Sequence, residues 1–279
     1  MRAKIMIAGM ASLLLLVLGV GLIVHTARQH VSPNRGFFAP KVLTNNDLSP
    51  RPPVPSPAGN QGMRQPDSST PRPDNTPPGY ETPPTKHPIF LAAFLGKLDE
   101  VKKLVAQDPA AVRLRDPEQH ATALHWAIIN GKQQVAAFLI AHGADIEAKG
   151  KQGMTPLHAA AYRGDTGIMT LLLARGANID AVDNADGTAL LKTVGHGHLD
   201  AAKLLLAHGA RVNVKERDGG LTPLHAAIVN KYPALVQLLL AHGADIKARD
   251  KSGATPLLYA QMARQPEIVK MLTKAGAKE

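Results

Sequence analysis

The sequence predicts an all-α solenoid of about six helix-turn-helix units with hairpin-like loops, preceded by one transmembrane helix and a disordered linker. Three observations support this prediction: an uncharged apolar run near the N-terminus, a concentration of proline after it, and a motif that recurs every 33 or 34 residues. The predicted boundaries are a basic N-terminus at 1–4, a transmembrane signal anchor at 5–24, a proline-rich disordered linker at 25–86 and a repeat domain at 87–279.

The apolar run at 5–24 contains 20 residues without a charge. A helix of that length spans about 30 Å, the thickness of a bilayer core. The run is longer than the apolar part of a secretory signal peptide, and His25 stands where a cleavage site needs a small residue. We therefore expect an uncleaved anchor with its N-terminus in the cytoplasm and the bulk of the chain outside, in the periplasm if the cell is Gram-negative. The alternative is a cleaved signal peptide and a freely diffusing exported protein.

The linker at 25–86 is defined by proline. Fifteen of the 22 prolines lie between Pro33 and Pro88. Proline removes a backbone donor and fixes φ, so such a segment forms neither long helices nor sheets. We expect a spacer, and the alternative is a peptide ligand for a proline-recognising domain, through patterns such as that at Pro52–Pro55.

Composition excludes some chemistry. The chain has no cysteine, which removes disulfides, thiolate metal sites and a cysteine nucleophile. The net charge of +10 is spread evenly: residues up to Lys86 contribute +5, and the rest contribute another +5. This diffuse excess gives weak support for an acidic partner. It gives none for nucleic-acid binding, which needs a concentrated basic field.

The recurring motif has two parts. The first, Thr-Pro-Leu-His-Ala-Ala, begins at Thr155 and Thr222, with looser copies at Thr122, Thr188 and Thr255. The second, Leu/Ile-Ala-x-Gly-Ala, follows the copies at Thr122, Thr155, Thr188 and Thr222 at a fixed offset, as in 173–177. A fixed period of this length is typical of stacked structural repeats.

One unit shows how the residues form two short helices. Thr155 caps the first helix and Pro156 occupies its first position, where no hydrogen bond is lost. That helix stops at Gly164, and a second runs from about Thr166 to Arg175. We expect Ile168, Leu171 and Leu172 to form the apolar face of the second helix. A cation at its end faces the negative end of the helix dipole (Arg175, and His142, His208, His242 and Lys274 in other units).

Both parts of the motif resemble the ankyrin-repeat family over residues 87–279, with repeats at about 87–121, 122–154, 155–187, 188–221, 222–254 and 255–279. The resemblance implies an ankyrin-repeat solenoid that binds protein partners on a concave face of loop tips and first helices, without catalytic residues. Two departures affect local geometry: Asp186-Gly187 places a turn glycine one residue late, and Lys231-Tyr232-Pro233 replaces the usual Gly-His-Leu.

The twelve histidines do not predict a metal centre. The resemblance assigns His125, His158 and His225 to a structural role, bonding adjacent loops. Within the His196-Gly197-His198 cluster, only His196 has no place in the repeat pattern, and a single histidine does not make a zinc site. The sequence contains no phosphate-binding loop, nucleophile elbow or zinc-protease motif. We therefore expect no enzyme activity, no cofactor, no metal and no nucleic-acid partner.

Positions that the family leaves variable predict the partner-binding face. Three loop tips carry basic pairs, which we expect to align as a positive ridge that binds an acidic protein surface; the alternative is that these charges are only solvated. The predicted partner-binding residues are Trp126, Ile129, Asn130, Lys149, Lys151, Gln152, Met154, Tyr162, Arg163, His196, Lys215, Arg217, Val229, Asn230, Arg249, Lys251, Tyr259 and Met262. The predicted function is a membrane-tethered protein-interaction module; the alternative is an exported soluble inhibitor or effector.

Overall fold

The computed structural model describes Tyr80 and residues 87–278. These residues form twelve α-helices and two short 3-10 helices, and no β-strand occurs among them. The α-helices are α2 (Pro88–Leu95), α3 (Leu98–Gln107), α4 (Ala123–Ile129), α5 (Gln133–Ala141), α6 (Pro156–Arg163), α7 (Thr166–Ala174), α8 (Ala189–Gly195), α9 (Leu199–Ala207), α10 (Pro223–Val229), α11 (Pro233–Ala241), α12 (Pro256–Met262) and α13 (Pro266–Lys274); the 3-10 helices are η2 (Pro109–Arg113) and η3 (Lys151–Gly153).

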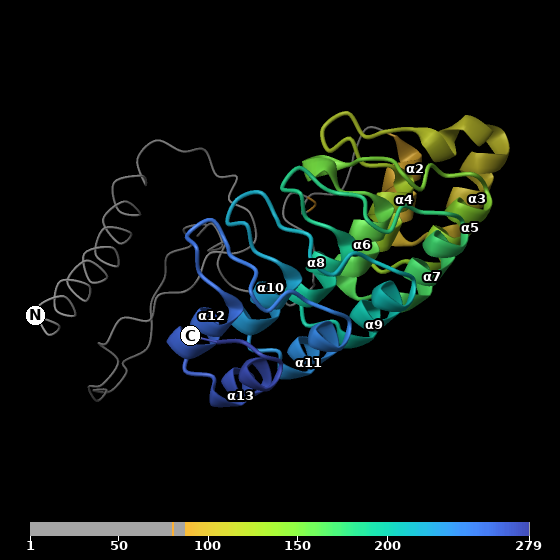
Figure 1. Ribbon diagram of the computed structural model, residues 1–279. Helices are drawn as coiled ribbons and strands as arrows, with labels where there is room; N and C mark the ends of the chain where they lie inside the picture. Colours follow the sequence, from red (N-terminus) through yellow and green to blue (C-terminus); the bar gives the residue numbers. More distant parts are fainter. Residues whose placement is uncertain (1–79, 81–86, 279) are drawn as a thin grey trace, which may run out of the picture. The chain divides into compact units, whose positions relative to one another are not determined.

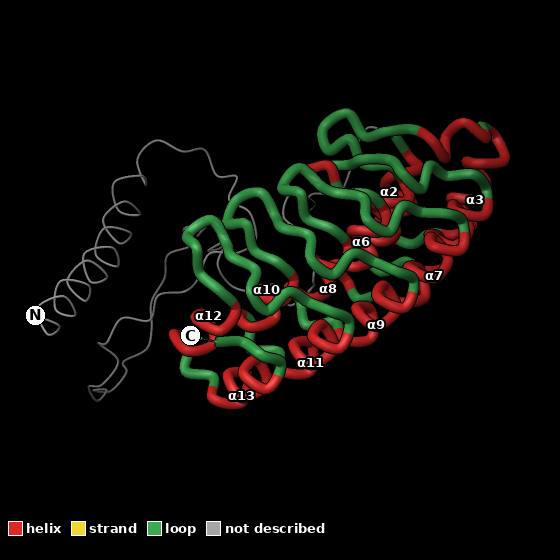
Figure 2. The backbone as a smooth tube through the Cα atoms, viewed as in Figure 1, coloured by secondary structure: helices red, strands yellow, loops and turns green. Residues whose placement is uncertain are grey.

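The helices stack in two rows (Figure 1). The first-helix row consists of α2, α4, α6, α8, α10 and α12, each packed on the next, and the second-helix row consists of α3, α5, α7, α9, α11 and α13. Each pair packs internally as well, so every unit contacts the units before and after it. Loops extend from the helix pairs along one edge of the stack (Figure 2). The expected all-helical solenoid of six units is confirmed.

Each first helix is short because its ends are fixed by capping residues. Thr155 precedes α6, Pro156 occupies its first position, and Gly164 ends it in the left-handed conformation, at φ 69°. The corresponding ends of α10 and α12 depart from this pattern. Lys231 and Arg264 take the left-handed conformation there, at φ 59° and 51°. The unusual residues at 231–233 therefore leave the chain path of the repeat unchanged, although a side chain in this conformation is strained.

The core repeats with the sequence. The leucine of each capping motif is at most 3 % exposed (Leu124, Leu157, Leu190, Leu224 and Leu257). A second series on the second helices is fully buried (Leu139, Leu172, Leu205, Leu239 and Leu272). Neighbouring units share these apolar faces, so no unit buries its core alone. One expected core residue is not in the core: Leu171 is 39 % exposed, because it lies on the side of α7 that faces away from the stack.

The predicted anchor at 5–24 lies outside the described residues, as does the predicted linker at 25–86 apart from Tyr80. In the part of the chain that the structure describes, no helix is both long and apolar enough to cross a membrane. Tyr80 is 1 % exposed, although it belongs to the predicted disordered linker. At least one residue of that segment therefore packs on the solenoid.

Candidate functional site

The first-helix row is built on a repeated threonine–histidine contact. In α6, the backbone N–H of Thr155 donates to Nδ1 of His158 at 3.2 Å. The same contact joins Thr122 to His125 at 3.2 Å and Thr222 to His225 at 3.3 Å. Since Nδ1 accepts a hydrogen bond from the backbone, Nε2 of each neutral ring is the nitrogen that carries a hydrogen. The contact thus fixes both the helix end and the orientation of the ring.

Two of these histidines bond the following loop, as expected. His125 Nε2 lies 3.0 Å from the Met154 carbonyl, and His158 Nε2 lies 2.9 Å from the Gly187 carbonyl. Burial lowers the pKa of both rings to about 4, so they are neutral near pH 7. With both nitrogens engaged in the interior, these histidines act as structural links between units.

An acidic residue organises four of the five loops between units. Asp183 Oδ1 accepts hydrogen bonds from the N–H groups of Ala185 and Gly187, at 2.9 and 2.8 Å. Asp116, Glu216 and Asp250 accept N–H groups of their own loops in the same way. The equivalent residue of loop 148–154 is Gly150, which has no side chain to accept them.

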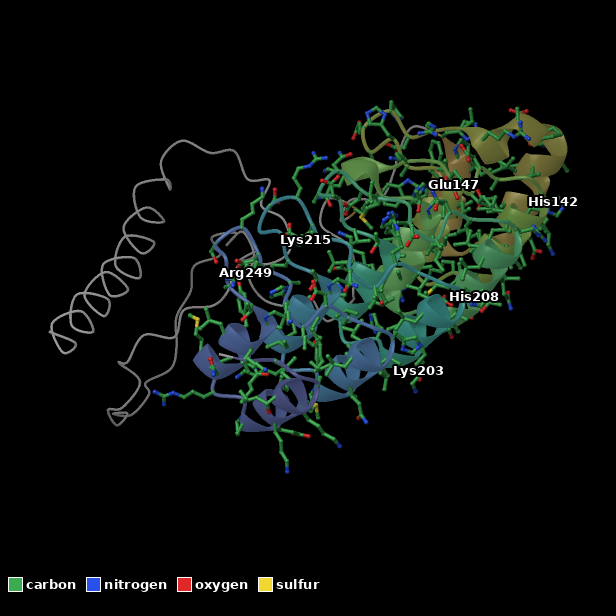
Figure 3. All side chains as sticks on the ribbon, viewed as in Figure 1. His142, Glu147, Lys203, His208, Lys215 and Arg249 are labelled. Carbon is green, nitrogen blue, oxygen red and sulfur yellow. The ribbon has the colours of Figure 1, made fainter. Side chains whose placement is uncertain are left out.

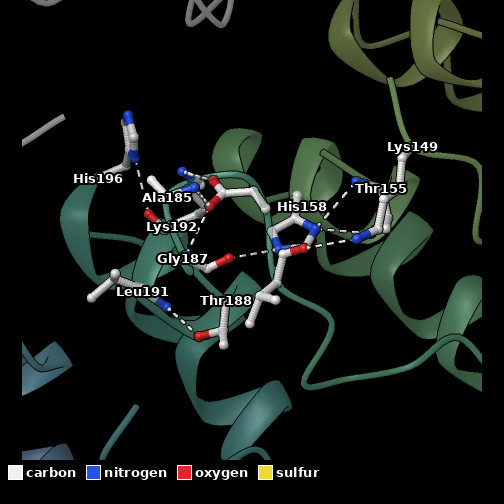
Figure 4. A network of polar contacts seen from close by, with 11 residues as sticks. Lys149, Thr155, His158, Ala185, Gly187, Thr188, Leu191, Lys192 and His196 are labelled. Carbon is white, nitrogen blue, oxygen red and sulfur yellow. Dashed lines mark hydrogen bonds and ion pairs between the residues drawn. The ribbon is translucent and has the colours of Figure 1, made fainter. Parts of the chain in front are cut away.

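Asp183 is also part of a buried ion pair (Figure 4). Lys192 on α8 reaches it with Nζ 2.6 Å from Oδ2, and the two side chains are 11 % and 4 % exposed. Burial opposes the charge on Asp183, but the Lys192 ammonium outweighs that effect, and the pKa of Asp183 lies below its usual value. Neither residue was among the predicted site residues. The signal that identifies the position of Asp183 is the acid that recurs in four loops.

Cross-unit hydrogen bonds join the loops into a continuous edge. Asn184 N–H donates to the Gln152 carbonyl at 2.8 Å, and Arg217 N–H donates to the Ala185 carbonyl at 2.7 Å. Lys251 N–H donates to the Gly219 carbonyl at 2.8 Å. Because these bonds are between backbones, they hold the loops at fixed spacing whatever side chains the tips carry.

Several basic side chains belong to this scaffold. Lys149 Nζ donates to the Val182 carbonyl at 3.4 Å. Lys215 Nζ donates to the Arg249 carbonyl at 2.7 Å, and Figure 3 labels these two residues. Arg217 makes two hydrogen bonds with the Asp186 carboxylate, each 2.9 Å long. The predicted positive ridge is therefore not continuous: loop 181–187 contributes an acid, and that acid pairs with Arg217.

Four predicted partner-binding residues are buried and cannot contact a partner from where they lie. Trp126 and Ile129 are fully buried, Met154 is 2 % exposed and Tyr162 is 7 % exposed. Trp126 contacts the rings of Tyr80 and Phe94, and Tyr162 lies beneath His196, with ring centroids 4.0 Å apart. These aromatic side chains pack along the stack because helices in the first row lie close enough to cover one another's side chains.

The other predicted residues are accessible. Among them, Met262 is 69 % exposed. Some have scaffold bonds as well: Arg163 donates to the Ile129 carbonyl at 2.9 Å, and the amide of Asn230 donates to the Ala226 carbonyl at 2.9 Å. The exposed residues are Lys149, Lys215, Arg217, Arg249, Lys251 and Met262, and the half-exposed residues are Asn130, Lys151, Gln152, Arg163, His196, Val229, Asn230 and Tyr259.

The three histidines at the ends of second helices have a defined role. His142, His208 and His242 each place Nδ1 within 2.9 Å of the carbonyl four residues earlier, so the ring closes the end of its own helix. His196 closes α8 in the same way, with Nδ1 2.9 Å from the Lys192 carbonyl, and burial lowers the pKa of its ring. Across the described ranges, no three acidic or histidine side chains gather closely enough to hold a metal ion.

A protein-family model described as ankyrin repeats (3 copies) matches residues 89–183, 157–250 and 215–279. Among solved structures, the ankyrin repeat domain of Bcl-3, a member of the IkappaB protein family, is similar with a TM-score of 0.63 and 29% identity. That match covers 69% of this chain and 87% of that one. An ankyrin repeat domain from Acinetobacter baumannii AYE is similar with a TM-score of 0.63 and 33% identity, over 68% of this chain and 98% of that one.

Similarity to curated proteins is shorter. The palmitoyltransferase akr1 of Schizosaccharomyces pombe is 47% identical over 62 residues, which are 22% of this chain and 10% of that protein. Alpha-latrocrustotoxin-Lt1a of Latrodectus tredecimguttatus is 43% identical over 67 residues, which are 24% of this chain and 5% of that protein. The chain thus spans a tenth or less of these two relatives.

Proposed function

The chain belongs to the ankyrin-repeat family, and from this premise we propose that it binds a partner protein along the exposed ends of its first helices and the tips of its loops. Ankyrin repeats form protein–protein interaction modules. One observation supports the choice of face. In the first helices, the leucine that recurs in five units is at most 3 % exposed, whereas the accessible residue at the helix end differs between units, as at Asn130, Arg163 and His196.

The favoured partner has an acidic surface. Lys149 and Lys151 lie on one loop, and Arg249 and Lys251 lie on another, all of them exposed or half-exposed. Lys215 adds an exposed ammonium on the intervening loop 214–221. Charges at such positions accelerate encounter with an oppositely charged surface and make binding sensitive to salt. Exposed apolar residues at the ends of the first helices, such as Met262 at 69 % exposure, supply apolar contact area.

Charge reversal tests this proposal. We expect Lys151→Glu combined with Lys251→Glu to weaken capture of the partner, with the largest loss at low ionic strength. The matched control is Lys203→Glu on α9, an exposed lysine away from the loops (Figure 3) that pairs only locally, with Asp200. Partners are identified beforehand by crosslinking in the native cell. Equal capture by the loop variant and the control would contradict an acidic partner.

The placement of the domain is a second part of the proposal. The apolar run at 5–24 supports a single-pass anchor with the repeat domain on the extracytoplasmic side. The alternative is a cleaved signal peptide and a soluble exported protein. Cell fractionation separates the two: full-length protein in the membrane pellet supports the anchor, and a shortened soluble form supports cleavage. Protection of the repeat domain from external protease in cells with a permeabilised outer membrane would contradict extracytoplasmic placement.

The proposal includes no enzymatic step. Histidine is the side chain that most often acts as a catalytic base. His125 and His158 use both ring nitrogens in structural hydrogen bonds instead. The carboxylates of Asp183 and Asp250 hold the N–H groups of their own loops. These groups stabilise the binding scaffold, and the exposed loop tips and helix ends remain for recognition.

A further inference from the structure

Loop 148–154 differs from the other loops at one position. Gly150 stands where Asp116, Asp183, Glu216 and Asp250 accept N–H groups of their loops. The backbone of Gly150, with φ −86° and ψ −158°, is extended and open to any residue. Glycine is therefore not required here by the path of the chain, and the reason for it lies in the surrounding space.

That space holds the hydroxyl of Tyr80. A Cβ atom on Gly150 would lie 2.5 Å from Tyr80 Oη, closer than such atoms approach one another. Tyr80 is separated from Gly150 by 70 positions and is 1 % exposed. The missing side chain of one loop is thus replaced by a side chain from the segment that precedes the solenoid.

Aromatic rings complete the pocket. The Tyr80 ring meets Trp126 of α4 edge to face, with centroids 5.3 Å apart and planes at 77°. Phe94 of α2 contacts the same indole, with centroids 5.9 Å apart and planes at 66°. Such edge-to-face pairs are favourable arrangements for aromatic side chains. We call the surface made by Phe94, Trp126 and Gly150 the tyrosine pocket.

The docking of Tyr80 has a cost in unsatisfied hydrogen bonds. Both the Tyr80 hydroxyl and Trp126 Nε1 are buried without a hydrogen-bond partner among the described residues. Each of these two groups can form a hydrogen bond with water when the Tyr80 ring is undocked, and each loses that bond on docking. The aromatic contacts favour docking, and the two unpartnered groups oppose it, so docking is weaker than the aromatic contacts alone would make it.

We propose that the tyrosine pocket is a binding site for a tyrosine side chain of an extended peptide, and that Tyr80 occupies it within this chain. A partner segment that presents a tyrosine then competes with Tyr80 for the pocket. This last step rests on the proposed function, because it names the chemistry of one partner segment. The occupation of the pocket by Tyr80 does not depend on any partner.

The first experiment measures whether Tyr80 shields Trp126, which is the only tryptophan in the 279 residues. In the full-length protein, we expect Tyr80→Ala to shift the tryptophan emission to the red and to increase its quenching by acrylamide severalfold. The matched control is Tyr232→Ala, which removes a tyrosine ring packed over Gly197 in another unit. Unchanged quenching in Tyr80→Ala, with unchanged circular dichroism, would overturn the proposal.

A second set of variants tests the pocket itself. Gly150→Ala places a methyl group where the hydroxyl lies, and we expect it to expose Trp126 as Tyr80→Ala does. Tyr80→Phe keeps the ring and removes the hydroxyl, so Trp126 should stay shielded. The double variant Gly150→Ala with Tyr80→Phe should then regain shielding, because the methyl group and the ring no longer compete. Failure of this rescue would contradict the assigned position of the hydroxyl.

The third experiment supplies a tyrosine from outside. The Tyr80→Ala protein is titrated with a synthetic peptide of residues 75–84, and we expect the emission of Trp126 to return toward that of the unaltered protein. The same peptide with alanine in place of its tyrosine should have no effect. Absence of any response would overturn the pocket as a peptide site, and partner capture that still depends on Lys151 and Lys251 would leave the proposed function standing.

Discussion

Loops 148–154 and 181–187 are neighbours in the stack, and each is held by a histidine of the preceding first helix. His125 bonds the Met154 carbonyl in one, and His158 bonds the Gly187 carbonyl in the other. They differ in what fills their centre. Loop 181–187 has its own acceptor, Asp183, and pairs it with Lys192 of the following helix. Loop 148–154 has Gly150 and a hydroxyl from Tyr80, a residue outside the repeats.

The same loop conformation is thus supported in two different ways. Loop 181–187 is supported by residues that belong to its own unit and the next one, so its stability is a property of the stack alone. Loop 148–154 instead packs against Tyr80, a side chain from outside the repeats. The four tests below probe this contrast, in order of decreasing effect for each side chain changed.

The largest effect is expected when Asp183 is removed. Asp183→Ala leaves the Lys192 ammonium buried without its partner and frees the N–H groups of Ala185 and Gly187. We expect a loss of about 3–5 kcal/mol in the free energy of unfolding, measured by urea denaturation. Asp183→Ala with Lys192→Met removes the unpaired charge as well and should recover part of the loss. A double variant no more stable than Asp183→Ala would show that the charge is not the cause.

Acid should destabilise both loops, because each is bonded by a buried histidine of the preceding first helix. The pKa of His125 and of His158 is about 4 in the folded protein, because burial disfavours the charged ring, against 6.5 for a free ring. Stability is therefore fully present above pH 6.5 and is lost as the pH falls from 6.5 toward 4, by up to about 3 kcal/mol for each ring. Thermal unfolding measured across this range checks the prediction.

The matched pair for the acid experiment is His158→Gln and His208→Gln. The first removes a buried ring that titrates on unfolding, so the dependence of stability on pH should become shallower. The second removes an exposed ring at the end of α9 and is the control for losing a histidine outside the interior. Equal pH profiles for the two variants would be evidence against buried neutral histidines.

A smaller effect is expected from Tyr80→Ala, which removes the side chain that packs beside Gly150 of loop 148–154. We expect a loss of about 2 kcal/mol in the free energy of unfolding, because the lost aromatic contacts are partly offset by the release of a buried hydroxyl. Adding Gly150→Asp gives the loop the acceptor that loop 181–187 already has, and should restore about 1 kcal/mol. If Gly150→Asp restored nothing, the analogy between the two loops would fail.

The smallest effect concerns backbone strain at the two tips. Gln152 and Asp186 both take the left-handed conformation, at φ 60° and 56°. Gln152→Gly relieves that strain, and we expect a gain of about 0.5 kcal/mol after the entropy cost of glycine is subtracted. Asp186→Gly relieves the same strain but loses the pair with Arg217, so its melting temperature should rise less. The two melting temperatures, compared under identical conditions, check this order.

Much of the scaffold was predictable from the sequence, because each unit repeats the same capping and core residues. The left-handed residue one position before Gly187 and the unusual helix end at Lys231 were both located by comparing copies of the motif. The binding face was less predictable. Trp126 packs against Tyr80 from outside the repeats, and Lys149 is bonded to the Val182 carbonyl of the next unit. Neither contact follows from periodicity.

The missing acid at Gly150 was visible in the sequence, since four other loops carry one at that position. An alignment of the five loops identifies Gly150 as the position without an acid. The residue that fills it could not be found in this way, because Tyr80 lies outside the repeats and its contact with Trp126 has no period. Sequence patterns thus reveal an unusual position more readily than the partner that explains it.

The bonds from Lys149 to the Val182 carbonyl and from Lys215 to the Arg249 carbonyl join a side chain of one unit to the main chain of the next. A main-chain acceptor is present whatever residue occupies the receiving position. These two bonds therefore survive a change of the receiving residue, whereas the Asp183–Lys192 ion pair between neighbouring units needs both side chains. The residues that receive such a bond are free to change as long as the donor lysine stays in place.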